Sequence, residues 1–258
     1  GGSTETLNIN GSITLIEEKI FGSNLVVAGL SYAMVRWFAV GDGSADDTIG
    51  IQNCINSLSD NSRVTFNGGN YLSTRINIDT KNNVIFEGNG STIQLSYGVS
   101  FTALFDIDGC QELDISGFDF VGTSDTDPLC NDDYRAIDVR SSSFTKIHHN
   151  TFSKISSNGI FARILNGGNL VEGVLITDNT FKDFSYDQTT PNQSAVTLSE
   201  DAEYSIVSNN FFFRVPSAIR FIDGANSSFI NNMVLNSNGD NWDGTLLSDR
   251  AAVFATFT

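Results

Sequence analysis

The sequence predicts an all-β fold, a parallel β-helix of about six or seven coils with a short N-terminal capping α-helix. Three observations predict it: a motif that recurs every 23 to 32 residues, short apolar segments of period two between its copies, and a composition suited to turns. Only 17% of the 258 residues are charged, whereas glycine, asparagine, serine, threonine and aspartate are abundant. A helix-rich protein would need more alanine, glutamate, lysine and leucine.

The recurring motif is Ile-x-x-Asn-x-Phe, with looser copies on either side. The copies, in chain order, are IFEGNG from Ile85, ISGFDF from Ile115, IHHNTF from Ile147, ITDNTF from Ile176, IVSNNF from Ile206 and FINNMV from Phe229. This spacing predicts one coil of a solenoid per copy. A propeller blade needs a longer period, and no segment after residue 60 carries the apolar spacing of a helical solenoid.

The motif aligns four asparagines, which are Asn150, Asn179, Asn209 and Asn232. Asparagine tolerates the left-handed conformation of a tight turn, and stacked amides can hydrogen-bond from coil to coil. We therefore expect these residues to be structural rather than catalytic.

Between the motif copies lie four-residue segments in which apolar and polar residues alternate. These are FDID at Phe105, IDVR at Ile137, IFAR at Ile160, VTLS at Val196, IRFI at Ile219 and VFAT at Val253. Each is bounded by turn-forming residues, as expected of a strand with one buried face.

The stretch GDGSADDTIGIQNCINSL predicts a short helix within residues 46–59. Asp46 and Asp47 suit a helix start, where a carboxylate accepts unpaired backbone N–H groups. Ile51, Ile55 and Leu58 form one apolar face, which we expect to cover the open end of the solenoid. The predicted organisation is a lead-in segment at 1–33 and a β-helix domain at 34–258, with coils from about 63 onward.

The segment VRWFAVGDGSADDTIGIQNCINSLSDNSRVTFNGGNYLSTRINI resembles the N-terminal signature of the pectate-lyase-like superfamily of right-handed parallel β-helix proteins, particularly its phage tailspike branch. The following NVIFEGNGSTIQLS resembles the strand pair usual after that signature, and with the coils the resemblance spans roughly residues 34 to 258. It implies the fold but no single reaction, because relatives include hydrolases, lyases, epimerases and binding proteins.

Charge and motif content limit the partners. The chain has 14 Lys and Arg against 30 Asp and Glu, a net charge of −16, which disfavours nucleic acid and anionic membrane surfaces. The sequence shows neither a secretion signal nor a run long enough to span a membrane.

Cys54, Cys110 and Cys130 lack metal-site spacing and are expected to be small buried side chains, with a Cys110–Cys130 bridge as an alternative.

If the alternating segments point their first and third residues inward, their other residues form two outward columns. The first column contains Asp106, Asp138, Phe161, Thr197, Arg220 and Phe254, and the second contains Asp108, Arg140, Arg163, Ser199 and Ile222. Aromatic, carboxylate and guanidinium groups together suit sugar rings, so we expect a substrate-binding face formed by Asp108, Arg140, Phe161, Arg163, Thr197, Arg220, Asp223 and Phe254. The alternative is a solvated face with ion-pair ladders such as Asp138 with Arg163. The long insertions GTSDTDPLCNDDY and SYDQTTPNQS favour a walled site.

Glycosidic cleavage needs two carboxylates, about 5 Å apart for retention or roughly 6.5–9.5 Å apart for inversion. Neighbouring coils lie about 4.8 Å apart, so Asp106 and Asp138 suit the shorter spacing, and Glu200 is the third catalytic candidate. Asp201 and Asp223 follow their strands on the same flank, where aspartate is commonly a turn residue.

No cofactor is expected; calcium would be needed only by a lyase, for which Arg140, Arg163 and Arg220 could neutralise a uronate. The sequence lacks the paired aspartates, His-Gly and Arg-x-Lys motifs of polygalacturonases. His148 and His149 are expected to be surface residues.

Two functional hypotheses remain open. The first is a phage tailspike-like protein of the virion tail or extracellular space, a homotrimer that binds and hydrolyses a bacterial surface polysaccharide. The second is a non-catalytic glycan-binding or structural module of a virion fibre, with a polysaccharide lyase or epimerase as a further alternative.

Overall fold

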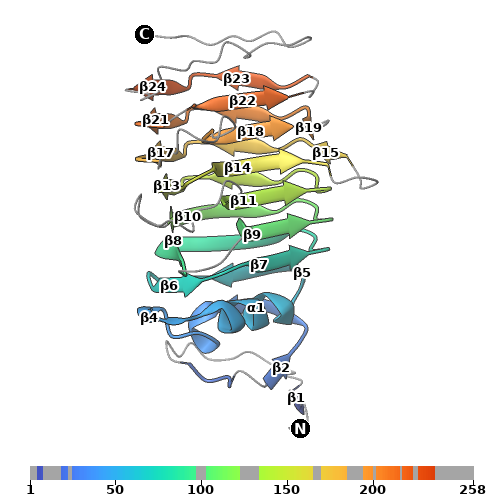
Figure 1. The fold of residues 1–258 in the computed structure, drawn as a ribbon. Coiled ribbons are helices and arrows are strands. Elements are labelled where there is room, and N and C mark those ends of the chain that lie inside the picture. The colour runs from blue at the N-terminus through green and yellow to red at the C-terminus, as the bar shows by residue number, and fades with distance from the viewer. Residues whose placement is uncertain are drawn as a thin grey trace.

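A computed structural model of the chain confirms the predicted parallel β-helix. It describes residues 5–7, 19–22, 25–96, 103–122, 134–164, 170–184, 194–199, 202–215, 217–222 and 226–235. The coils stack along one axis, from the N-terminal end at the bottom of Figure 1 to the C-terminal end at the top. All strand pairs are parallel, and each strand pairs with its counterpart in the next coil.

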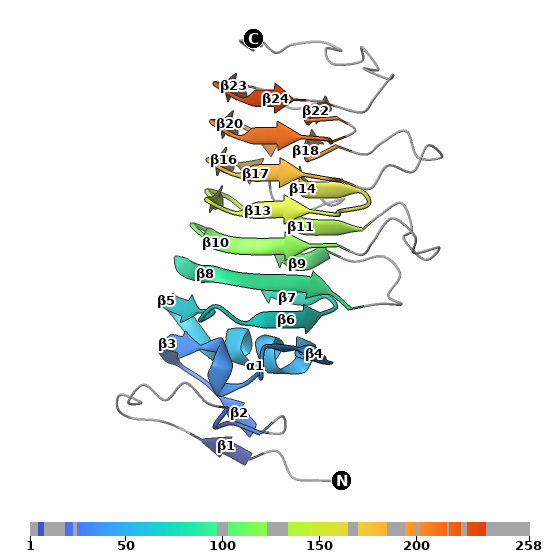
Figure 2. The same ribbon diagram turned by 90° about the vertical axis from the view of Figure 1, so that its left-hand side faces the viewer.

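The coils form three strand faces. The first face contains β3 (Leu30–Met34), β5 (Leu58–Thr65), the first parts of β8 (Val84–Leu95) and β10 (Asp114–Val121), β12 (Lys146–His148), β16 (Leu175–Thr177), β20 (Ile206–Ser208) and β23 (Ser228–Ile230). The second, prominent in Figure 2, contains β4 (Asp42–Asp46), β6 (Asn70–Ser73), the second parts of β8 and β10, β13 (Thr151–Ser153), β17 (Thr180–Lys182), β21 (Phe211–Phe213) and β24 (Met233–Leu235).

The third face, turned toward the viewer in Figure 1, carries the predicted outward columns. It contains β7 (Ile76–Asp79), β9 (Ala103–Asp108), β11 (Arg135–Arg140), β14 (Asn158–Arg163), β18 (Val196–Ser199) and β22 (Ile219–Ile222). The remaining elements are β1 (Glu5–Leu7), β2 (Leu25–Val27), β15 (Val171–Glu172), β19 (Ala202–Glu203), the 3-10 helix η1 (Val35–Trp37) and α1 (Thr48–Ser57).

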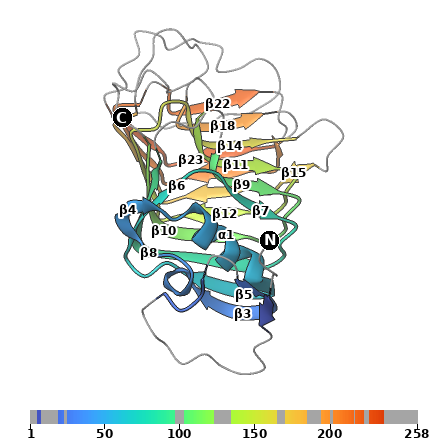
Figure 3. The same cartoon turned by 60° about the horizontal axis from the view of Figure 1, so that its bottom comes forward.

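Helix α1 covers the N-terminal end of the stack, as the sequence predicts, and Figure 3 views it from that end. Ile51, Cys54 and Ile55 are buried, and the helix contacts β2, β3, β5 and β7. The stack begins earlier than residue 63, because β3 already pairs with β5.

The two aspartates at the helix start have different roles. Asp46 accepts a hydrogen bond from the backbone N–H of Thr48, as expected at a helix start. Asp47 makes no such cap; its buried carboxylate accepts from the backbone N–H groups of Val40 and Gly41, at 2.9 and 3.1 Å. It therefore fixes the preceding loop rather than the helix end.

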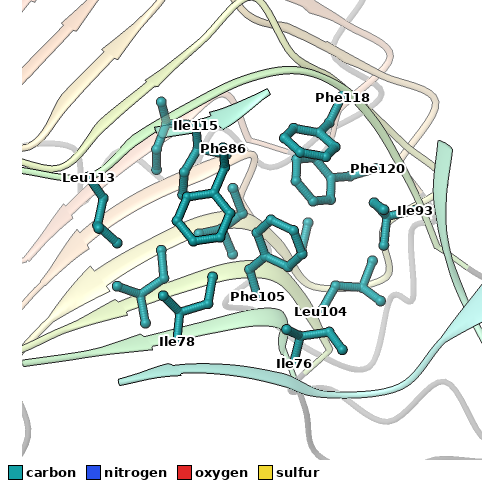
Figure 4. Close-up of a cluster of buried hydrophobic side chains, with 14 of the residues drawn as sticks. Ile76, Ile78, Phe86, Ile93, Leu104, Phe105, Leu113, Ile115, Phe118 and Phe120 are labelled. Carbon is teal, nitrogen blue, oxygen red and sulfur yellow. The ribbon is translucent and has the colours of Figure 1, made fainter. Parts of the chain in front are cut away.

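The side chains that point inward fill the solenoid with apolar rings. Phe66, Phe105, Phe118 and Phe120 pack edge to face or tilted in the lower coils, as Figure 4 shows for the last three. Higher in the stack, Phe152, Phe181 and Phe212 lie nearly parallel, with centroids 4.7 and 4.9 Å apart. Identical residues in register thus form a continuous core column.

The register corrects two assignments within the repeat. Ile147 and Ile176 align with Val207 rather than Ile206, and Phe152 and Phe181 align with Phe212. Ile115 aligns with Phe86 rather than Ile85. The correct inward frame is one residue later in both copies, because Val207 is buried whereas Ile206 is 40% exposed.

The same shift changes the asparagine row, whose members are Asn150, Asn179, Asn210 and Asn232. The amide nitrogens of Asn150, Asn179 and Asn210 each donate to the amide oxygen in the next coil, at 3.1–3.2 Å, which confirms the predicted ladder; that of Asn232 donates to the backbone oxygen of Val207. The left-handed residues are instead those just before the ladder, His149, Asp178, Asn209 and Asn231. The ladder is structural, because every one of these amides is occupied within the stack.

Candidate functional site

The third face brings the predicted outward columns together. Asn77, Asp106, Asp138 and Phe161 are consecutive register partners, and Thr197 and Arg220 continue this column. The second column places Asp79, Asp108, Arg140 and Arg163 in register. Their strand neighbours Phe105, Ile107, Ile137 and Val139 are fully buried, so the period-two interpretation of these segments is correct.

Asp106 and Asp138 are adjacent, but each of the two carboxylates is paired with two arginines. The Asp106 side chain is 7% exposed and forms ion pairs with Arg75 and Arg140. The Asp138 side chain is 6% exposed, and its Oδ2 atom accepts from Arg135 at 2.9 Å and Arg163 at 3.1 Å. The Asp138–Arg163 pair is the ion pair expected of a ladder.

Phe161 lies between the same two arginines as Asp138. The guanidinium carbons of Arg135 and Arg163 stand 4.4 and 5.1 Å from the centre of its ring. Such cation–π contacts stabilise the charge of the arginines and hold their side chains. The ring therefore supports the arginine pair around Asp138.

A groove of about 590 Å³ lies on this face over β7, β9 and β11. Its lining consists of Arg75, Asn77, Asp79, Thr80, Asp108, Gly109 and Arg140. Asp79 is exposed, and the side chain of Asp108 is 38% exposed with Arg140 at 3.8 Å. Asp106 is not itself a lining residue, but both arginines that pair with it line the groove.

The register fixes how far apart the Cβ atoms of Asp79, Asp106 and Asp108 lie. Asp79 and Asp108 are direct partners on strands about 4.8 Å apart. Asp79 and Asp106 are diagonal neighbours, and such pairs on one sheet face lie about 7–8 Å apart. From Cβ atoms at this spacing, two aspartate side chains can place their carboxyl groups at the roughly 6.5–9.5 Å separation that an inverting glycosidase needs.

Burial raises the pKa of Asp106 above its ordinary value of 3.8. The guanidinium groups of Arg140 and Arg75 act in the opposite direction, whereas the negative charge of Asp138 adds to the increase. The net effect moves Asp106 toward its protonated form relative to an ordinary aspartate. Such a group can act as a general acid.

The raised pKa of Asp106 predicts that the free energy of unfolding depends on pH. Because the folded pKa of Asp106 is raised, its contribution to stability is fully present below pH 3.8 and is lost as pH rises through the folded value. Asparagine does not titrate, so the Asp106→Asn variant does not lose this contribution. The free energy of unfolding of the variant minus that of wild type should therefore increase from about pH 4 to about pH 8. Urea unfolding of both proteins at each pH measures the difference. The opposite trend would show that the arginine pairs outweigh burial.

The remaining predicted residues differ in their placement. Thr197 is buried in a polar cluster, where its hydroxyl contacts Ser194 at 2.6 Å and donates to Asn158 at 2.7 Å. Arg220 is half-buried on β22, four coils above the groove strand β9. Glu200, Asp201, Asp223 and Phe254 lie outside the residues that the structure describes.

The other singled-out residues lie away from the groove. His148 contacts Asp114 at 2.7 Å on the first face, and His149 is exposed. Cys54 and Cys110 are buried free thiols, and Cys130 lies outside the described residues.

Sequence reasoning missed five of the seven groove residues; besides Thr80 and Gly109, these are Arg75, Asn77 and Asp79. The last three belong to the segment RINID, in which Ile76 and Ile78 are fully buried and the intervening residues point outward. The same period-two rule that found the strand at Phe105 would have found this one.

Within the described ranges, no three histidine, cysteine, aspartate or glutamate side chains converge in a way that could hold a metal ion. No described helix is both long and apolar enough to cross a membrane.

The fold and the groove define a parallel β-helix with a polar, carboxylate-lined depression on one strand face. No protein-family model matches the sequence, and no curated protein matches it. A proposed glycosyl hydrolase of Parabacteroides merdae is similar in structure, with a TM-score of 0.57 and 13% identity, over 85% of this chain and 100% of that one. ORF18 of Geobacillus virus E2 is similar with a TM-score of 0.51 and 20% identity, over 79% of this chain. This chain spans 42% of the length of the virus protein, and both similarities are of fold alone.

Proposed function

We propose that the protein binds a polysaccharide in the groove and hydrolyses one of its glycosidic bonds. The observation that carries the proposal is the placement of Asp79, Asp106 and Asp108 beside two arginines on one rigid strand face. Carboxylates accept hydrogen bonds from sugar hydroxyls and guanidinium groups donate to sugar oxygens, so the lining suits a carbohydrate.

The proposed reaction uses Asp106 as general acid and Asp79 as general base. Asp106 gives its proton to the glycosidic oxygen as the bond to the anomeric carbon breaks. Asp79 takes a proton from a water molecule, whose oxygen attacks the anomeric carbon from the opposite side. One water is consumed, one new reducing end forms, and the configuration inverts.

The two arginines paired with Asp106 determine when its carboxyl group can contact a bound sugar. Arg75 is 43% exposed, whereas Arg140 is 14% exposed and also lies near Asp108. Arg75 is therefore the partner that a bound sugar can displace from Asp106. Arg140 stays in place and orients both Asp106 and Asp108.

The substrate we propose is a bacterial surface polysaccharide, and the protein is proposed to be a homotrimeric, tailspike-like component of a virion tail or an extracellular enzyme. The similarity in fold to a protein of Geobacillus virus E2 and to a proposed glycosyl hydrolase supports this assignment. Asp138 and Glu200 remain predicted catalytic residues that a variant series would test beside Asp79.

The pH profile of hydrolysis follows from the acid role. A general acid must be protonated, so kcat/KM should fall as pH rises through the pKa of Asp106, which burial raises above 3.8. The falling alkaline limb should be absent from the residual activity of Asp106→Asn. Rates measured from about pH 4 to pH 9 check this, and an unchanged alkaline limb in the variant would assign the acid to another residue.

The test of the function is incubation with purified capsular and O-antigen polysaccharides, followed by sizing of the products. Hydrolysis gives shorter chains and new reducing ends without the ultraviolet absorbance of an unsaturated uronate. Shorter chains with that absorbance would identify a lyase instead.

A second candidate function is glycan binding without cleavage. It is favoured by the ion pairs of Asp106 and Asp138, because the charge of a carboxylate paired with two arginines is already neutralised. Retention of the protein by a polysaccharide whose length does not change would establish this function and exclude hydrolysis of that polymer.

A further inference from the structure

Two exposed aromatic side chains lie on one corner of the coil stack, outside the groove. Phe144 is 55% exposed and Tyr204 is 53% exposed. Both have left-handed backbone conformations, with φ of 55° and 52°. A left-handed backbone is unfavourable for a bulky residue, and an exposed ring adds little to the core.

The two residues occupy equivalent positions two coils apart. The backbone N–H of Phe144 donates to the backbone oxygen of Glu172 at 2.7 Å, and that of Gly173 donates to the backbone oxygen of Glu203 at 2.9 Å. Glu172 and Glu203 are register partners in β15 and β19, at the right-hand edge of Figure 1. Phe144, Gly173 and Tyr204 therefore follow one another along the stack, and the outer two are separated by about 9.6 Å.

Gly173 leaves room for the Phe144 ring between them. A Cβ atom at Gly173 would lie 2.8 Å from Cδ1 of Phe144, so the ring lies against the glycine backbone. A larger residue there would displace the ring. The glycine thus allows Phe144 to lie against the coil that separates it from Tyr204.

The corner itself does not require aromatic residues. Asn61, Asn83 and Asn226 have the same left-handed conformation within or just before strands of the first face, and asparagine adopts it more readily than phenylalanine or tyrosine. The rings therefore need a reason other than the turn.

We propose that this corner, formed by Phe144, Gly173 and Tyr204, is a second carbohydrate site that binds a neutral polysaccharide chain. The apolar C–H face of a sugar ring stacks on an exposed aromatic ring, and two such rings that follow one another along the coil axis can each stack one sugar of the same chain. Glu112, Glu172 and Glu203 flank the rings and can accept hydrogen bonds from hydroxyl groups. The same carboxylates repel a polyanion, so the ligand is neutral.

The site is distinct from the groove but belongs to the same coils. Phe144 follows Arg140, a groove residue, by four positions. A long polymer could therefore engage both, although the corner binds sugar whether or not the groove cleaves it.

The test replaces both rings by asparagine, the residue that the left-handed turn prefers. Gel mobility of wild type and the Phe144→Asn, Tyr204→Asn double variant is measured in gels that contain hydroxyethyl cellulose, galactomannan, dextran or alginate. Wild type should be retarded by at least one neutral polymer and not by alginate. The double variant should bind that neutral polymer about tenfold more weakly.

Two further variants separate the possible failures. His149→Asn replaces an exposed ring at a left-handed position on another corner, and it should be retarded like wild type. Asp79→Asn removes the proposed base of the groove. The retardation by the neutral polymer that is due to the corner should remain in this variant. The proposal is overturned if no neutral polymer retards wild type, if the double variant is retarded equally, or if alginate binds as well as the neutral polymers.

Discussion

Replacing Asn179 by alanine is expected to lower the free energy of unfolding by about 3 to 5 kcal/mol. The Asn179 amide donates to the backbone oxygen of Ile147 and to the amide oxygen of Asn210, and it accepts from the backbone and side chain of Asn150. Alanine would leave the buried N–H of Asn150 and the oxygen of Ile147 without these partners. Urea unfolding followed by circular dichroism measures the loss.

Asn209→Asp is the matched control for this ladder variant. Asn209 lies one position before the ladder, is exposed and has a left-handed backbone, so the exchange should change the free energy of unfolding by less than about 0.5 kcal/mol. A loss below about 1 kcal/mol for Asn179→Ala would contradict a stabilising ladder.

Replacing Asp106 by asparagine is expected to lower kcat for polysaccharide hydrolysis by about 10²- to 10⁴-fold, because the amide cannot give a proton to the leaving oxygen. The asparagine keeps the shape of the side chain, so KM should change little. Initial rates of reducing-end formation at saturating polymer measure kcat. Full activity in this variant would remove Asp106 from the mechanism even if the protein is a hydrolase.

Asp119→Asn is the control, because Asp119 lies on β10, on the second face of the same coil region. It should hydrolyse the polymer at the wild-type rate. Asp79→Asn should lose activity to an extent similar to Asp106→Asn, since both groups act in one step.

Most of the architecture could be predicted from the sequence, because a solenoid repeats one local rule. Alternating apolar residues identified the third face over β9, β11, β14, β18 and β22 and the outward positions on these strands, but not the outward residues of β7. The assignment of inward-facing residues was wrong by one position only in IVSNNFFF and NVIFEGNG, where neighbouring positions carry interchangeable residue types. The packing of Val207 and Phe212 against the core decides the frame, and this long-range contact is not visible in a local pattern.

The site was less predictable than the fold. Spacing correctly placed Asp106 beside Asp138, but three of the four arginines that pair with them, Arg75, Arg140 and Arg163, come from outside the strand of the aspartate that they contact; only Arg135 shares β11 with Asp138. Arg75 and Asp79 line the groove, but they belong to RINID, a segment that was not recognised in the sequence as one of the alternating strands. Likewise, Asp47 looks like a helix cap locally but binds Val40 and Gly41 once the loop is folded.

The measurement that tests the central claim most directly is a crystal structure of Asp106→Asn with an oligosaccharide from the polymer that wild type shortens. We expect an intact chain in the groove, with a sugar over Asp79 and Asp108, Arg75 displaced, and the glycosidic oxygen within hydrogen-bonding distance of residue 106. An oligosaccharide bound on another face, with the groove empty, would contradict the account.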